Sequence, residues 1–364
     1  MQKETISSHL AVCILILFIF GSSVILGVNC DAEQDSWISL ILALLLTLPF
    51  LLIYARIMKL FPEKDIFEII ETVFGKIFGK CFILLLSWYG LHLCALVLRD
   101  FSEFVEISFM PETPQVPIMI IMIVVVAYMV VSGVKTMGRW SLGVLPFILF
   151  VVVLTTTLAI HKMDFTNIQP VLEHHFRTIF VGSYKLFTFP LAETVLFLVI
   201  ADAVRKEDSP YRIYLYAIFF GVLVLLIVIL RNMLLLGSEV VCAEYFPSYM
   251  AARILSVADF MARIEGSIAM NFILAGVVKM AVCLIAATKG LAYLFHLANY
   301  KQIVFPMALL SMALCVTLYS NAMEMFDFLD IYQYYAIPFQ IIIPLLIWLF
   351  AEIKIRRQKV PEAQ

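Results

Sequence analysis

Two ionisable side chains lie near the middle of stretches of sequence that are mainly apolar. Glu193 stands in the run 180–202, and Lys279 stands near the middle of the run 267–294. A charged group at the centre of a membrane is costly, so each needs water or an oppositely charged partner. Glu193 could receive backbone amides, pair with a cation or carry a proton, and a structural hydrogen-bonding role stays open. Lys279 could pair with a carboxylate such as Glu193 and could replace a bound cation by its own charge.

A second group of polar residues lies in the run 81–109. Arg99 and Glu103 have the i, i+4 spacing of a helical ion pair, and Asp100 and Glu106 stand beside them. This pattern is also typical of residues that anchor the end of a span at the membrane interface. A polar and aromatic band that could line a cavity precedes them and consists of Trp88, Tyr89 and His92.

Two apolar runs contain residues that interrupt helices. The first run holds Gly21-Ser22-Ser23, and the sixth holds Phe189-Pro190, where proline removes an amide donor. Broken helices expose unpaired amides and carbonyls that can hold a solute at mid-membrane depth. Alternatively, Gly21 only permits close helix packing and Pro190 only kinks a helix. Because the two interruptions stand in the first and sixth runs, we interpret them as the matching breaks of a five-plus-five inverted repeat.

The elements that must position these residues are membrane-spanning helices. The chain has 364 residues, of which 63% are hydrophobic and 14% charged, whereas soluble domains are about 25% charged. Since a backbone inside a bilayer must satisfy its own hydrogen bonds, the apolar runs predict an all-α integral membrane fold of about ten transmembrane helices. We expect one polytopic domain over residues 1–364, with spans near 8–28, 37–58, 81–109, 116–134, 140–160, 180–202, 211–236, 267–294, 303–320 and 332–352.

The distribution of basic residues predicts the orientation of the chain. Most lysines and arginines between the spans fall on the side that also carries both termini, including the groups at 56–80, 205–212 and 354–359. Short loops rich in these residues face the cytoplasm, so we expect both termini there. Two amphipathic stretches add short surface helices, at 63–78 on the cytoplasmic side and at Tyr249–Ile264 outside.

Several classes of function find no support in the sequence. It has no Gly-rich phosphate loop, no His-Glu-x-x-His motif and no nucleophile elbow. The pair His174-His175 lacks the aspartate expected a few residues later in a membrane acyltransferase. We therefore expect no enzyme and no metal or other cofactor. Because the sequence has no basic block, we also expect no nucleic-acid partner. Cys30 and Cys242 fall in predicted outer loops, where a disulfide between them is possible.

The chain resembles the endospore germination permease family, which comprises the B subunits of Ger-type nutrient germinant receptors. The resemblance covers the chain from about Ser8 to the basic tail. It is carried by Gly21-Ser22-Ser23, Trp37, Arg99-x-x-x-Glu103, Pro111–Pro114, Asn167–Leu172 and Phe189-x-x-x-Glu193. It implies membership of the amino acid-polyamine-organocation superfamily, with ten helices in a LeuT-like five-plus-five repeat.

The resemblance also implies a role. The chain would sense a small germinant, an amino acid or a sugar, in the inner membrane of the spore, together with a membrane A subunit and a lipoprotein C subunit. A proton- or cation-coupled amino acid transporter, with Glu193 and Lys279 as its ionic elements, is the alternative. Lys279 departs from the small polar residue of the family, so we expect a ligand other than alanine. The predicted binding residues are Gly21, Ser22, Ser23, Tyr89, Leu93, Phe189, Pro190, Glu193, Val278 and Lys279.

Overall fold

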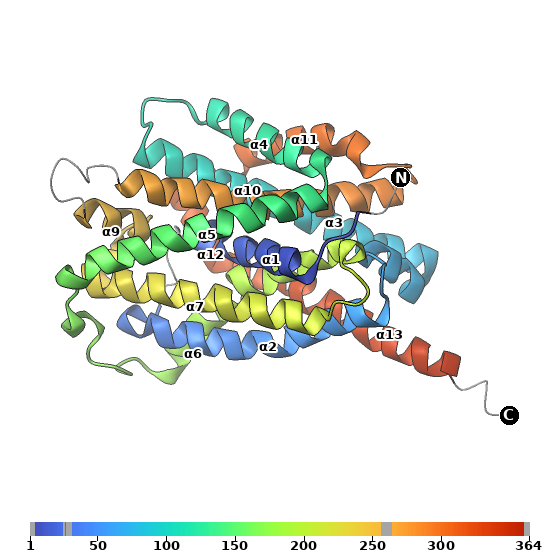
Figure 1. Cartoon of the computed structure of the whole chain (residues 1–364), viewed down its shortest axis with the longest axis horizontal. Helices are drawn as coiled ribbons and strands as arrows, with labels where there is room; N and C mark the ends of the chain where they lie inside the picture. Colours follow the sequence, from blue (N-terminus) through green and yellow to red (C-terminus); the bar gives the residue numbers. More distant parts are fainter. Residues whose placement is uncertain (1–3, 25, 27–30, 256–263, 360–364) are drawn as a thin grey trace.

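The computed structural model describes residues 4–24, 26, 31–255 and 264–359 of the chain. These residues form helices and connecting loops, and they contain one isolated bridge, between Ile6 and Val204, but no longer strand. Most of the long helices run along the longest axis of the molecule (Figure 1). The prediction of an all-α fold is therefore confirmed.

The helices follow the order of the apolar runs. The first half of the chain contains α1 (Ser8–Ser23), α2 (Ser36–Leu60), α3 (Ile66–Ser108), α4 (Gln115–Ser132) and α5 (Val134–Ala159). The second half contains α6 (Phe176–Leu186), which continues through Phe187–Leu191 into the 3-10 helix Ala192–Ala203, and then α7 (Pro210–Leu236), α8 (Ser238–Ala243), α9 (Pro247–Leu255), α10 (Ile264–Leu294), α11 (Val304–Leu318), α12 (Ala322–Ile337), the π-helical turn Pro338–Ile342 and α13 (Ile343–Lys359). Short 3-10 helices cover Glu33–Asp35, Ile160–Lys162, Phe165–Ile168 and Tyr300–Ile303.

Nine helices in the described ranges are long and apolar enough to cross a membrane. The helix α1 is also apolar, but it ends at Ser23 and its 16 residues are too few for it to be counted among the nine. With α1 counted as a tenth span, interrupted within the bundle, the composition and the helices agree on an integral membrane protein.

The last span differs from its expected extent. We expected it near 332–352, but the helix runs from Ala322 to Arg357 through the π-helical turn. The side chain of Asn321 caps its start by accepting a hydrogen bond from the Glu324 amide. Because the acidic residues of α12 lie at its exposed outer turns, they interrupt the apolar pattern without ending the helix.

The amphipathic stretch 63–78 is helical from Ile66 onward and is continuous with the third span. Asp65 caps its first turn and forms a capping box with Glu68. Gly75 has a φ of 76° and changes the direction of the chain within α3. The outer amphipathic stretch is described as far as Leu255, where it forms α9, and residues 256–263 lie outside the described residues.

The first helix lies in the centre of the bundle. It packs against α10, α7 and α5, and every side chain from Cys13 to Ser23 is buried. Beside it, α10 packs along α3 at close range: a Cβ added to Gly90 would lie only 2.6 Å from the Ala286 Cβ. Only glycine permits this approach, and it brings α3 and α10 together around the polar residues described next.

Both ends of the described chain lie at the same end of the bundle, which we call the terminal end (Figure 1). The connections with α8 and α9 lie at the other end, which we call the distal end (Figure 1). At the terminal end the segment before α1 pairs with the end of the sixth span, since the Ile6 amide donates to the Ala203 carbonyl at 2.7 Å. The Ser8 amide donates to Asp208 Oδ2 at 2.8 Å.

Candidate functional site

The first helix break follows the Gly21-Ser22-Ser23 sequence. The helix α1 ends at Ser23, whose hydroxyl donates to the Ile19 carbonyl at 2.6 Å. Serine side chains that bond the preceding turn in this way compete with the helical backbone pattern. The predicted interruption of the first span is confirmed.

The second break lies at Phe187–Leu191. Phe189 has extended backbone angles, φ −135° and ψ 114°, and Pro190 has no amide to donate. Because Phe189 is extended, the helical hydrogen-bond pattern is interrupted here, and the Thr188 carbonyl accepts a hydrogen bond from Gln340 Nε2 at 2.8 Å. This segment packs against α1, so the two breaks lie against each other, as the broken-helix interpretation requires.

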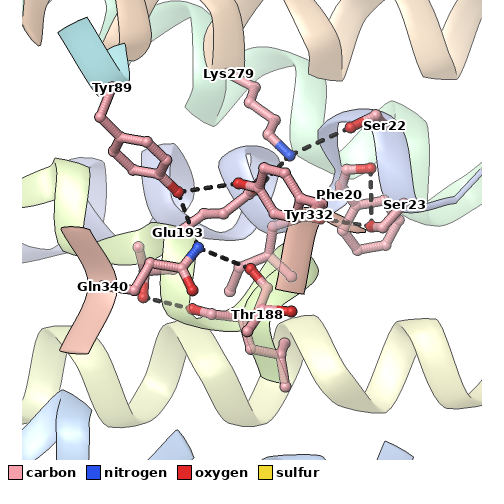
Figure 2. Close-up of polar contacts among 12 residues, drawn as sticks. Phe20, Ser22, Ser23, Tyr89, Thr188, Glu193, Lys279, Tyr332 and Gln340 are labelled. Atoms are coloured by element: carbon pink, nitrogen blue, oxygen red, sulfur yellow. Dashed lines mark hydrogen bonds and ion pairs between the residues drawn. The ribbon is translucent and has the colours of Figure 1, made fainter. Parts of the chain in front are cut away.

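An ion pair joins the two breaks to α10, which is the eighth span. Lys279 Nζ lies 2.6 Å from Glu193 Oε2, and both side chains are 0% exposed. The same ammonium donates to Ser22 Oγ at 3.2 Å and lies 4.7 Å from the centre of the Phe189 ring. Figure 2 shows Lys279 reaching toward Ser22 of α1 and Glu193 of the sixth span. Each charge is thus neutralised without water.

The other oxygen of Glu193 is held by a chain of uncharged groups. Tyr332 donates to Glu193 Oε1 at 2.5 Å, and its hydroxyl lies 3.0 Å from that of Tyr89 (Figure 2). Gln340 Nε2 donates to the Tyr89 hydroxyl at 2.8 Å. Since Tyr332 uses its one hydrogen on Glu193, Tyr89 must donate to Tyr332, and all the donors point toward the carboxylate. The chain therefore favours an ionised Glu193.

A cavity of about 350 Å³ lies on the distal side of the two breaks. Ser23, Thr188, Phe189, Pro190 and Tyr332 line it near the breaks. Its other walls come from α2, α7, α8 and α12, and Lys185 lies in its lining, 2.7 Å from Asp330 and 2.8 Å from Asp31. A small solute could reach the two breaks through this cavity.

The terminal side of the site is closed by a separate polar cluster. Lys289 Nζ lies 2.8 Å from Asp202 and 3.6 Å from Asp65. These two ion pairs join α10 to the sixth span and to the start of α3. Burial raises the pKa of Asp65 to about 6, against the opposing effect of Lys289.

Most of the predicted binding residues meet at this place. Gly21, Ser22, Ser23, Tyr89, Phe189, Pro190, Glu193 and Lys279 surround the ion pair or line the large cavity. Leu93 lines a smaller cavity beside Glu193. Val278 is fully buried next to Lys279.

Two residues of the site did not emerge from the sequence. Tyr332 and Gln340 carry no charge, so a search for ionisable groups in apolar runs passes over them. The available signal was the position of Gln340, a polar amide near the middle of the last apolar run. The Arg99–Glu103 pair, at 2.6 Å, is buried, with side chains 7% and 6% exposed, and therefore does not anchor the helix at a solvated surface.

Two other expectations concern cysteines and metals. Cys242 is disulfide-bonded, whereas Cys30 lies outside the described residues. Over residues 4–24, 26, 31–255 and 264–359, no group of three or more His, Cys, Asp or Glu side chains is placed to hold a metal ion.

Comparison with known proteins identifies the family. A family model described as "Spore germination protein" matches residues 5–323, and the chain belongs to this family. It is 25% identical to spore germination protein KB of Bacillus subtilis (strain 168), over 99% of this chain and 98% of that protein. It is 27% identical to the putative spore germination protein YfkT of the same strain, over 89% of each chain. Spore germination protein A2 matches 56% of the chain at 21% identity.

Solved structures establish the fold. The structure of MhsT in complex with L-phenylalanine superposes with a TM-score of 0.69 at 12% identity, covering 96% of this chain and 90% of that one. Mhp1, a nucleobase-cation-symport-1 family transporter, gives 0.66 at 9% identity, covering 92% and 76%. These are LeuT-fold transporters, and the predicted five-plus-five fold with broken first and sixth helices is confirmed.

Proposed function

We propose that this chain is the nutrient-sensing B subunit of a spore germinant receptor and binds a small germinant between the two helix breaks. The observation that carries the proposal is the buried Lys279–Glu193 pair, which is 2.6 Å long and is shared by α10 and the sixth span. Ser22 ties it to α1, and Tyr332 ties it to α12. A ligand that exchanged with any of these contacts would change how four helices are held together.

The germinant acts by shifting the populations of two arrangements of the bundle. A ligand does this only through its different affinity for the two states. Moving a population from 1:99 to 99:1 takes about 5.5 kcal/mol, which is large for a molecule of amino acid size. A partial shift in each of many clustered receptors is therefore the more economical response.

The distribution of charge supports the orientation that we propose. Arg205 and the adjacent Lys206 lie at the terminal end, where the Arg205 amide donates to the Ile6 carbonyl, and α13, which carries Lys354, ends there too (Figure 1). Short basic segments face the cytoplasm. With both termini in the cytoplasm and the chain in the inner membrane of the spore, the large cavity lies on the side from which nutrients arrive. The chain works with a membrane A subunit and a lipoprotein C subunit, which carry the signal onward, and its apolar outer face contacts membrane lipid.

A proton- or cation-coupled amino acid transporter remains the second candidate, because the fold is that of transporters, among them MhsT with bound L-phenylalanine. One fold can serve both roles. Proteoliposomes that contain this chain alone separate them, because a transporter would concentrate a labelled amino acid inside the vesicles and a receptor subunit would not.

The decisive experiment is a nutrient panel on spores in which this receptor is the only one present. We expect a response to at least one small nutrient, and we expect Lys279→Met to change the preferred nutrient or its effective concentration. Lys206→Met is the matched control, because Lys206 is exposed at the terminal end. The proposal fails if spores with normal amounts of the chain respond to no nutrient.

A further inference from the structure

A second buried carboxylate lies beside the ion pair. Asp100 of α3 is 6% exposed and lies near Ser22, Lys279 and Glu193. The nearby cations are Lys279, which is paired with Glu193, and Arg99, which is paired with Glu103 at 2.6 Å. The five groups therefore carry one more carboxylate than cations. In a membrane interior such an excess charge must be neutralised, either by a proton on the carboxylate or by a further positive group.

The space for that group is a small cavity between α3, the second break and α12. It has a volume of about 20 Å³, and Asp100, Glu193, Tyr319 and Tyr332 are its polar lining residues. A cavity of this size holds one group as large as a water molecule. The buried Tyr319 hydroxyl has no hydrogen-bond partner within the described part of the chain. The rest of the lining is apolar and includes the rings of Phe189 and Phe328.

This lining suits a primary ammonium group. An ammonium has three hydrogens to donate, and the two carboxylates and the free Tyr319 hydroxyl supply three acceptors. Aromatic rings also stabilise a cation. A hard metal ion such as Ca²⁺ or Mg²⁺ would need about six oxygen ligands, which these rings and aliphatic side chains do not provide.

The small cavity adjoins the large one. Phe189, Leu329 and Tyr332 line both, so the two cavities meet at these three side chains. We propose that the small cavity binds the primary ammonium group of the germinant, while the rest of that molecule occupies the large cavity. This inference rests on the proposed function and deepens it: the germinant is an amine or an amino acid, not an uncharged sugar.

The first test compares nutrients on spores that carry only this receptor. The probes are a series of L-amino acids, the matching 2-hydroxy acids, glucose, and ammonium chloride alone. We expect an amino acid to trigger germination, and its hydroxy acid, which differs at the ammonium group, to be inactive. A hydroxy acid or glucose that is equally active would overturn the inference and leave the receptor role intact. Full activity of ammonium chloride alone would show that the site takes the free ion, and would also overturn it.

The second test changes the site. Asp100→Asn should raise the half-maximal amino acid concentration about tenfold to a hundredfold, because a charge-assisted hydrogen bond is lost. Tyr319→Phe removes one uncharged acceptor and should give a smaller shift, and Asp327→Asn on the exposed face of α12 should give none. Immunoblots must show normal amounts of each chain. Unchanged dose curves for both Asp100→Asn and Tyr319→Phe contradict the inference, whereas wild-type spores that respond to no probe contradict the proposed function.

Discussion

Gly21 lies directly against the side chain of Lys279. A Cβ added at position 21 would come within 2.4 Å of Lys279 Cδ and 2.9 Å of its Cβ. The lysine can cross from α10 to Glu193 only because the first helix carries no side chain at this point. The sequence of the first break thus determines the position of the charge in the eighth span.

Filling this space should disable the site. Gly21→Leu would push the lysine stem away from α1 and separate Lys279 from Glu193, so we expect the nutrient response of spores to be lost. Germination dose curves measure the effect. Gly143→Leu is the control, because position 143 is exposed and has no atom within 4 Å of an added Cβ. A normal response from Gly21→Leu would remove the first helix from the site.

Breaking the buried ion pair should destabilise the protein. Glu193→Gln and Lys279→Met each leave one buried charge without its charged partner. Either substitution should lower the free energy of unfolding by about 3–5 kcal/mol. The double variant removes both charges and should be less destabilised than the sum of the two single variants. Unfolding of the purified protein in detergent measures this. Additive losses would mean that the two side chains are not coupled.

The hydroxyl of Tyr332 should matter more than its ring. Tyr332→Phe deletes the 2.5 Å bond to Glu193 and should cost about 1.5–3 kcal/mol, as expected for a hydrogen bond to a charged group. Tyr334→Phe, two residues along the same helix, is the control because Tyr334 is 66% exposed. Thermal denaturation of the two variants compares them directly, and equal melting temperatures would argue against the bond.

The cluster at the terminal end predicts a dependence on pH. Burial raises the pKa of Asp65 from 3.8 to about 6. The folded protein therefore holds this proton more tightly than the unfolded chain, and the stability from this group is complete below pH 3.8 and is lost as the pH rises through about 6. The loss should be at most about 3 kcal/mol.

The variant Asp65→Asn tests this dependence, because an asparagine side chain also caps a helix but does not titrate. The substitution should flatten the fall in melting temperature over this range. Asp164→Asn serves as the control. Hydrogen bonds from Thr166 lower the pKa of this exposed residue, so its contribution to stability changes with pH in the opposite direction. A wild-type melting temperature that stays constant between pH 3.8 and 6 would contradict the assignment.

The sequence predicts the breaks well because their causes are local. Pro190 lacks an amide wherever it lies, and the serines after Gly21 compete with helix hydrogen bonds on their own. The charges at Glu193 and Lys279 are similarly conspicuous in apolar surroundings.

Other parts of the site depend on packing that no local pattern encodes. Tyr332 and Gln340 belong to the site because α12 and the turn after it pack against the second break. The acidic residues in the first turns of α12 interrupt the apolar pattern, so the pattern did not indicate where this helix begins. The sequence around Asp100 is equally compatible with an interfacial anchor, but packing buries this residue near Ser22, Lys279 and Glu193.

The most direct measurement is an experimental structure of the purified receptor with the nutrient that triggers it. We predict that the nutrient lies between Ser23, Phe189 and Tyr332, in contact with the Lys279–Glu193 pair or its hydrogen-bonding partners. A nutrient bound elsewhere, with this ion pair and its contacts unchanged from the nutrient-free receptor, would contradict the proposed site.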